Sequence, residues 1–218
     1  MNKLKTFLAA ATLAFVATTA SAAVVVTVEN SGQMTTTQTG VTTVDFNDGT
    51  IGTYIADAVR DDYLIFNSPA VLPSSPGGSA SPAGITDGYL SVPNPTAPGS
   101  AQFFLGGGNF NYFGLFWGSV DTYNTLSFFS GGTEIASYTG SQLSPLLATG
   151  NQQSDMSNRY VNFFFNGGST FDTIRLTSSG IAFETDNHSF GVVPEPSMIA
   201  LFGLGIFGLG FAARKKRS

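Results

Sequence analysis

The stretch RYVNFFFNGGSTFDTIRLTSSGIAFETDNHSFGVV, residues 159–193, decides the fold class of this chain. Three short apolar segments alternate in it with Gly-rich turns. In the middle segment Ile174 and Leu176 fall on one side of an extended chain, while Arg175 and Thr177 fall on the other. This period of two predicts three antiparallel strands in a sheet that has one face in water.

Similar signals occur upstream. The sequence predicts a strand at Tyr112 to Trp117 and a hairpin whose turn is Ser130 to Thr133. Earlier strands are expected in TTVDFND, at 42–48, and near Tyr63 to Phe66. No segment between the two ends of the chain shows a helical period. We therefore expect an all-β domain, an antiparallel β-sandwich of jelly-roll type.

A Pro-, Gly- and Ser-rich stretch at 69–100 interrupts this pattern, since it holds seven of the chain's ten prolines. Proline cannot pair continuously in a sheet, so we expect a long surface loop with a short strand at Gly88 to Val92. Such a loop either binds a ligand or only connects strands, and the sequence leaves both readings open.

Charge and cysteine content restrict the partners of the chain. The segment 23–193 has thirteen acidic residues against three basic ones, hence a net charge of −10. Such a surface repels nucleic acid and anionic lipid, so neither is expected as a partner. The chain has no cysteine, so its stability comes from burial and not from disulfides.

The N-terminus has the three parts of a secretory signal. Two lysines precede an apolar run at 7–16, and small residues follow. This order predicts a helical signal peptide over residues 1–22, cleaved between Ala22 and Ala23.

The C-terminal segment, residues 192–218, also has three parts. It begins with Pro194, Glu195 and Pro196, continues with an uncharged run at 198–213, and ends in a basic tail at 214–218. As a helix the run is about 24 Å long, against a hydrocarbon core of about 30 Å, so we expect one short transmembrane helix. The tail is expected to stay in the cytoplasm. Its basic residues are Arg214, Lys215, Lys216 and Arg217.

The triplet, the apolar run and the basic tail together resemble the PEP-CTERM sorting signal of Gram-negative bacteria, a segment also labelled ice-binding protein C-terminal domain. In that family an exosortase, a membrane peptidase-like enzyme, cuts near the triplet and removes the tail. The resemblance implies an exported chain, held transiently in the inner membrane and then left at the cell surface or in the extracellular matrix. The expected partners are the secretion machinery and an exosortase, with exopolysaccharide or biofilm as a further candidate.

The central domain, expected at 23–191, carries a second resemblance. The runs YFGLFWGSVDTYNTLSFF, NRYVNFFF and FETDN resemble the ectodomains of a group of proteobacterial PEP-CTERM proteins over most of residues 40–190. That resemblance implies boundaries and fold more than activity. An early DF-D and a late FE-DN pattern are similar, more distantly, to calcium-stabilised carbohydrate-binding jelly rolls.

The residues for common enzyme chemistries are sparse. His188 is the only histidine, and there is no cysteine and no Gly-x-Ser-x-Gly motif. We interpret His188 as a polar residue at a strand end. Asp61 and Asp62 would point to opposite faces of a strand, which makes them a poor acid/base pair. A non-enzymatic protein is therefore expected, and no catalytic residue is assigned.

Calcium is the candidate cofactor, because acidic loops at the edge of a sandwich supply hard oxygen ligands. Asp45 and Asp48 after an early strand would meet Asp186 and Asn187 in the last strand if those two strands are neighbours. The alternative is that Asp48 belongs to a plain turn and Asp186 to the surface.

Exposed aromatic side chains would bind glycan by stacking on sugar rings. Trp117 shares its side of the strand with Phe113 and Leu115, which favours the core for it. Tyr112 on the other side, and Tyr123 in a polar connection, are the candidates for glycan contact.

Three classes of function follow. The favoured one is an exported, exosortase-processed, non-enzymatic surface or matrix protein associated with exopolysaccharide. The alternative is a calcium-dependent glycan-binding module. The third is a carboxylate-dependent glycoside hydrolase, which requires a pair of carboxyl groups about 5 to 10 Å apart.

Overall fold

The computed structural model describes residues 24–47, 63–66, 70–73, 75, 78–93, 96–106, 108–144 and 147–194. Several predictions made from the sequence lie outside these residues. They are the signal peptide with Ala22 and Ala23, the transmembrane run 198–213, the basic tail, Glu195, Pro196, Asp48, Asp61 and Asp62. Within the described residues no helix is long and apolar enough to cross a membrane.

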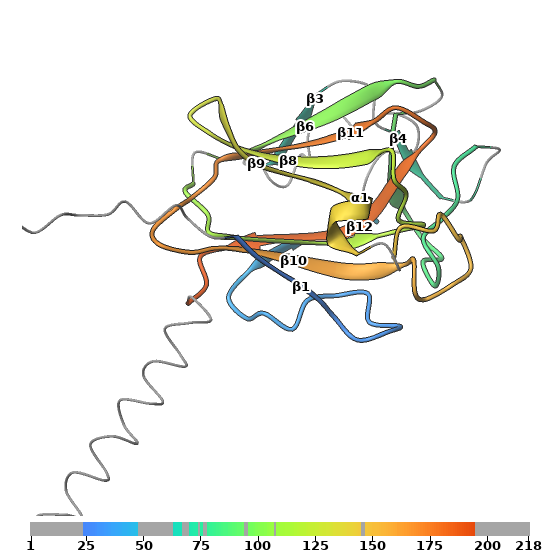
Figure 1. Cartoon of the computed structure of the whole chain (residues 1–218), viewed down its shortest axis with the longest axis horizontal. Coiled ribbons are helices and arrows are strands. Elements are labelled where there is room, and N and C mark those ends of the chain that lie inside the picture. The colour runs from blue at the N-terminus through green and yellow to red at the C-terminus, as the bar shows by residue number, and fades with distance from the viewer. Residues whose placement is uncertain are drawn as a thin grey trace, which may run out of the picture.

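The described chain forms two antiparallel sheets that lie one above the other (Figure 1). In the larger sheet the order is β1-β10-β7-β12-β5-β4, with β2 also paired to β12, and in the smaller it is β3-β6-β11-β8-β9. The single described helix, α1, is one turn long at Gly140–Leu143. The strands are β1 Val24–Val28, β2 Thr42–Val44, β3 Tyr63–Phe66, β4 Ala70–Leu72, β5 Tyr89–Val92, β6 Gly99–Leu105, β7 Tyr112–Trp117, β8 Asn124–Ser130, β9 Thr133–Thr139, β10 Arg159–Phe165, β11 Thr173–Ser178 and β12 Phe183–Gly191.

The all-β prediction is confirmed, with the predicted strand at Tyr112–Trp117 and a β8–β9 hairpin that turns between Ser130 and Thr133. The stretch 159–193 forms three strands, as its period of two indicates, and β11 lies in the smaller sheet while β10 and β12 lie in the larger. Consecutive strands thus cross between the layers. The jelly-roll assignment itself stays a prediction.

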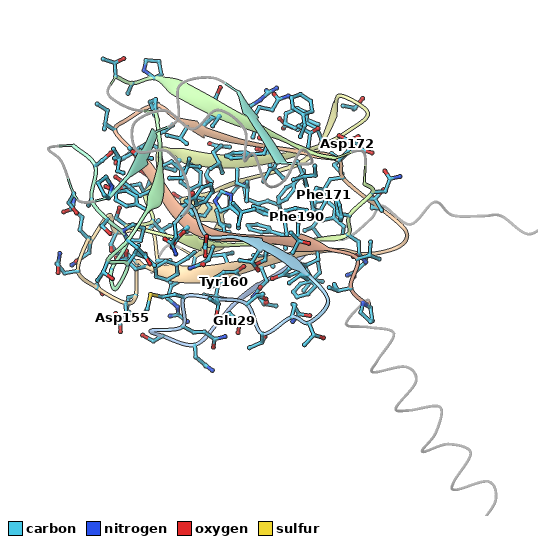
Figure 2. The ribbon with its side chains drawn as sticks, turned by 180° about the vertical axis from the view of Figure 1, so that it is seen from behind. Glu29, Asp155, Tyr160, Phe171, Asp172 and Phe190 are labelled. Carbon is cyan, nitrogen blue, oxygen red and sulfur yellow. The ribbon has the colours of Figure 1, made fainter. Side chains whose placement is uncertain are left out.

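The core fills the space between the two sheets. Ile174 and Leu176 of β11 are fully buried there, while Arg175 and Thr177 on the opposite side are partly exposed, as the alternation predicts. Trp117 is also fully buried and stacks on Phe183, with ring centroids 4.3 Å apart. Figure 2 shows Phe171 and Phe190 between the sheets. Aromatic burial of this extent supplies most of the driving force for folding.

Strand β7 is buried on both faces, so Tyr112, on the side of the strand opposite Trp117, is also shielded from water. The segment at 29–41 runs beneath the larger sheet (Figure 1), and its Thr36 is hydrogen-bonded to Tyr112. The Tyr112 hydroxyl donates to Asn162 Oδ1 at 2.7 Å and lies 2.5 Å from the Thr36 hydroxyl oxygen. This loop therefore covers the outer face of the larger sheet at Tyr112.

The described part of the stretch 69–100 contains more strand than the predicted loop, which corrects that prediction. It contains β4, β5 and the start of β6, and its short strand is confirmed at Tyr89–Val92. Residues 78–88 pack against the larger sheet, because Ala80 N donates to Glu184 Oε1 at 3.1 Å and Ala83 N donates to Asn158 Oδ1 at 2.9 Å. Its described prolines lie outside these short strands, in the segments that connect them.

His188 lies in the middle of β12, not at a strand end, and this corrects its assignment as an end residue. Its ring is fully buried, with edge-on contacts to Phe46, Phe103 and Phe113 at centroid distances of 4.9 to 5.5 Å. Nε2 is 2.8 Å from Thr185 Oγ1. The histidine is therefore a core residue with a polar contact to Thr185.

Candidate functional site

An acidic pocket of about 270 Å³ lies where the end of β2 meets β12. It brings together Asp45, Asp186 and Asn187, three of the four residues that the sequence proposed for calcium. Asp48, the fourth, lies outside the described residues. The full lining is Met34, Asp45, Asn47, Gly84, Ile85, Thr86, Asp87, Asp186 and Asn187.

Two neighbouring strands place these side chains together. β2 pairs with β12 so that Val44 lies opposite His188, as the calcium prediction required of an early and the last strand. Beyond this pair the backbone leaves the regular strand conformation, at Phe46 with φ 57° and at Asn187 with φ 51°. A register shift between Asp186 and Ser189 interrupts the pairing of β12 with β7. Such bulges reorient side chains at a sheet edge.

Asp186 is the least solvated group of the pocket. It is 1% exposed, and its Oδ1 is buried without a hydrogen-bond partner. Its Oδ2 accepts from Asn187 Nδ2 at 3.2 Å. Burial, with smaller effects from the charges of Asp87 and Asp45, raises the pKa of Asp186 to about 8. The pocket thus holds a carboxyl group whose ionised form lacks a compensating charge.

Cation binding is the chemistry that this arrangement favours, since carboxylate and amide oxygens are the ligands that calcium prefers. Among the described residues, no group of three or more His, Cys, Asp or Glu side chains is close enough to hold a metal ion as placed. Asp45, Asp87 and Asp186 therefore line one pocket without forming a closed cluster. Calcium also takes amide oxygens and water as ligands, and Asn47 and Asn187 are at hand.

Asp87 is a pocket residue that sequence reasoning missed. It lies in the ITDGYL segment, inside the stretch that was predicted as a loop. An Asp-Gly pair just before a strand usually indicates a turn, and nothing local shows that this turn folds over β12. The packing of residues 78–88 against the larger sheet supplies that information.

A second carboxyl group, Glu184, is buried on the same strand at 3% exposure. Its Oε1 accepts from Ala80 N at 3.1 Å and its Oε2 from Ser119 Oγ at 3.2 Å. Burial raises the pKa of Glu184 to about 7, although these hydrogen bonds lower it. Both of its oxygens have partners, so Glu184 serves to hold the covering loop in place.

The two tyrosines proposed for glycan contact have different environments. Tyr112 is fully buried, so its assignment as a glycan contact is wrong, because segment 29–41 covers its ring. Tyr123 is 37% exposed and its ring lies over Gly180, where an added Cβ would approach it to 2.9 Å. Burial and the neighbouring Asp121 raise the pKa of the Tyr123 hydroxyl. Tyr123 therefore stays partly accessible to solvent.

The folded domain ends at a clamp on Val193. Val193 N donates to Asn111 Oδ1, and Asn111 Nδ2 donates to Val193 O, each at 2.8 Å. The next residue, Pro194, is exposed. The Pro-Glu-Pro triplet thus begins at the residue that follows this clamp.

Comparison with known families identifies the C-terminal segment that begins at this clamp. The chain carries a PEP-CTERM protein-sorting motif at residues 192–217, so the resemblance seen in the sequence is confirmed. The motif indicates an exported protein that is addressed to the exosortase sorting machinery. No curated protein and no solved structure matches the chain.

Proposed function

We propose that this chain is a non-enzymatic cell-surface or extracellular-matrix protein that associates with exopolysaccharide after exosortase has removed its C-terminal segment. The observation that carries the proposal is the sorting motif at 192–217, placed directly behind the clamp on Val193. An acidic all-β domain of this kind suits a passive surface role, because its net charge of −10 over 23–193 keeps it soluble.

The proposed route has three steps. A signal peptide at 1–22 directs export and is removed before Ala23. The run 198–213 holds the chain in the inner membrane, with the basic tail in the cytoplasm. Exosortase then cuts near Pro194, and the sandwich is left at the cell surface or in the matrix.

Fractionation of cells tests this route. Changing Pro194, Glu195 and Pro196 together to alanine is expected to leave an uncut, membrane-bound protein, because the recognition element is lost. Deleting residues 194–218 is expected to give soluble, secreted protein, because neither anchor nor signal remains. Normal processing of the triple-alanine variant would overturn the proposal. Changing exposed Met156 to alanine serves as a control that leaves the motif intact.

The acidic pocket supports a second candidate function, calcium binding at Asp45, Asp87, Asp186 and Asn187. The observation that favours it is Asp186 Oδ1, a buried carboxylate oxygen with no partner. Burial raises the pKa of this group, and a divalent cation bound beside it would stabilise its ionised form. We propose calcium because the available ligands are hard oxygens from carboxylates and amides.

A thermal-shift titration of the full chain in nonionic detergent tests the calcium site. Calcium is expected to raise the Tm of the wild type, because a ligand that binds only the folded state stabilises it. Asp186→Asn is expected to abolish this shift. Asp155→Asn removes the same charge from an exposed site outside the pocket and is expected to keep it. A wild type without a calcium shift, or an equal shift in Asp186→Asn, would overturn this candidate.

A further inference from the structure

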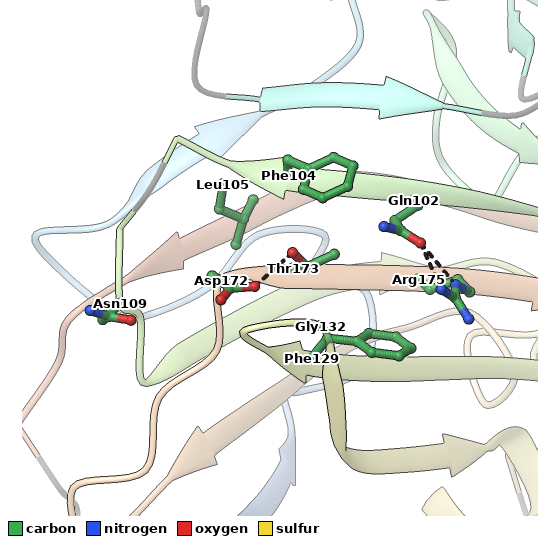
Figure 3. Close-up of a pocket in the computed structure, with 9 residues that line it drawn as sticks. All are labelled: Gln102, Phe104, Leu105, Asn109, Phe129, Gly132, Asp172, Thr173 and Arg175. Carbon is green, nitrogen blue, oxygen red and sulfur yellow. Dashed lines mark hydrogen bonds between the residues drawn. The ribbon is translucent and has the colours of Figure 1, made fainter.

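A second pocket, of about 440 Å³, lies on the outer face of the smaller sheet (Figure 3). We refer to it as the sheet pocket. Its volume is within the range of about 300–1,000 Å³ that is usual for small-ligand sites. The lining residues are Gln102, Phe104, Leu105, Asn109, Phe129, Gly132, Asp172, Thr173 and Arg175.

The strand register builds the sheet pocket from two rows of outward-facing side chains. In one row Phe104 of β6 lies beside Thr173 of β11, which in turn lies beside Phe129 of β8. In the next row Gln102 of β6 lies beside Arg175 of β11. Cross-strand neighbours of this kind are in direct contact, so the sheet holds the pocket rigidly.

Arg175 is fixed in place by neutral groups. Its Nε and Nη2 donate to Gln102 Oε1 at 3.1 and 2.7 Å, and its guanidinium lies 4.4 Å from the centre of the Phe129 ring. Figure 3 shows Gln102 and Arg175 joined across the two strands. Within the described part of the chain, no carboxylate forms an ion pair with Arg175. This arginine therefore presents an uncompensated positive charge in a domain of net charge −10.

Asp172 lines the same pocket but does not pair with Arg175, and its oxygens accept from other groups. Oδ1 accepts from Thr173 Oγ1 and Oδ2 accepts from Gly131 N, each at 2.7 Å. These bonds hold the carboxylate at the rim of the pocket, and each oxygen keeps a further lone pair for a ligand hydroxyl. Asn109 on the same rim adds amide donors and an acceptor.

Phe104 provides an apolar surface beside these polar groups. Its side chain is 41% exposed, against 37% for Tyr123. An accessible ring next to planar amide, carboxylate and guanidinium groups is the combination that binds a sugar, since the ring takes the C–H face and the polar groups take the hydroxyls.

We propose that the sheet pocket binds a saccharide that carries a carboxylate, a uronic acid residue of an extracellular polysaccharide. The sugar ring packs on Phe104, its carboxylate pairs with the Arg175 guanidinium, and its hydroxyls bond to Asn109 and Asp172. Arginine suits the carboxylate because its planar fork matches two oxygens. The inference rests on the proposed function, since export brings the pocket to such a polymer.

The charge of the domain restricts which acidic saccharide fits. A uniformly charged polyuronate would be repelled by the net charge of −10, while a chain with one uronate among neutral sugars meets mainly the local field of Arg175. The proposed ligand therefore contains isolated carboxylates, spaced further apart than the Debye length of about 8 Å at physiological salt.

Calorimetric titration of the full chain in nonionic detergent tests the site. The probes are a tetrasaccharide with one glucuronate and the same tetrasaccharide with its carboxyl group reduced to an alcohol. The wild type is expected to bind the acidic form about tenfold or more tightly, because a charge-assisted hydrogen bond is lost with the carboxylate. Equal affinity for the two probes, or no binding of either, would overturn the proposal.

Variants locate the site. Arg175→Gln is expected to lose the preference for the acidic probe, and Arg175→Lys to retain part of it. Phe104→Ala is expected to weaken both probes by a similar factor, about three- to tenfold. Ile135→Ala, on β9 of the same sheet at 39% exposure, is the matched control and is expected to change neither. Binding that survives Phe104→Ala and Arg175→Gln, or is abolished by Tyr123→Ala instead, would overturn the assignment.

The test separates this inference from the proposed function. A chain that is cut and exported in cells but binds neither probe overturns the saccharide site alone. A chain that binds the acidic probe in the calorimeter but is never cut overturns the sorting proposal alone.

Discussion

Two buried ionisable side chains in β12 give the stability of the domain opposite dependences on pH. The pKa of Glu184 is raised to about 7 and that of His188 is lowered to about 3, in both cases mainly because burial disfavours the charged form. Unfolded, they titrate near 4.5 and 6.5. Each therefore stays neutral in the fold over a range of pH in which it would be charged in the unfolded chain.

Glu184→Gln is expected to remove the loss of stability that ionisation of Glu184 causes as the pH rises. The stability from neutral Glu184 is fully present below pH 4.5 and is lost as the pH rises to about 7, a loss of about 3 kcal/mol at most. The amide is nearly isosteric and does not ionise. Denaturant unfolding at pH 4.5 and at pH 8 measures the effect, and an unchanged difference between the two pH values in the variant would contradict it.

His188 is expected to remain neutral at pH 5. Its burial lowers its pKa to about 3, so the stability that it contributes is present above pH 6.5 and is lost as the pH falls towards 3. Because it is the only histidine in the chain, ¹⁵N NMR of the imidazole reports on it without overlap. A titration midpoint near 6.5 would show that the ring is solvated and that the core packing around it is wrong.

For single residues, the sequence predicts on which side of a strand a side chain lies. It does not predict which distant segment of the chain packs against that side chain. Asp45, Asp48, Asp186 and Asn187 were expected to lie together only if an early strand and the last strand are neighbours. β2 and β12 do pair, and Asp45, Asp186 and Asn187 line one pocket, while Asp48 lies outside the described residues. Tyr112 was misassigned because the segment that covers it lies more than 70 residues away in sequence. Side-chain alternation gives the side of a strand, but it does not show whether a loop later covers that side.

At the level of elements, β11 offers a direct test of the alternation. Ile174 faces the core and is fully buried, while Thr177 faces outward and is partly exposed. Ile174→Ala is expected to cost about 3 kcal/mol of unfolding free energy, because it removes buried methyl groups and leaves a cavity. Thr177→Ala is the matched control on the same strand, expected to change stability by less than about 0.5 kcal/mol.

Urea unfolding of the two variants measures these costs. Similar destabilisation by both would mean that β11 is buried on both faces or does not form as described.

The strand pattern that predicted β11 is local, which explains why most strands were found from the sequence. The pairing order of the sheets is not local, and the stretch 69–100 shows this. A short strand was expected there, but β4 and its pairing with that strand at the far edge of the larger sheet were not.

For the whole molecule, the sandwich and the sorting motif meet at one point. Asn111 fixes Val193 by two hydrogen bonds, and the triplet follows with Pro194 exposed. The sequence alone indicated the motif, because its three parts are contiguous and need no tertiary information. The sheet pocket was not predicted, because Gln102, Phe129 and Arg175 come from three strands that only the fold brings together.

The intact mass of the protein recovered from the cell surface or medium tests the central claim most directly. The account predicts a mature chain that begins at Ala23 and ends near Pro194, without the run 198–213 and the basic tail. A surface form whose mass includes the chain through Ser218 would contradict exosortase processing.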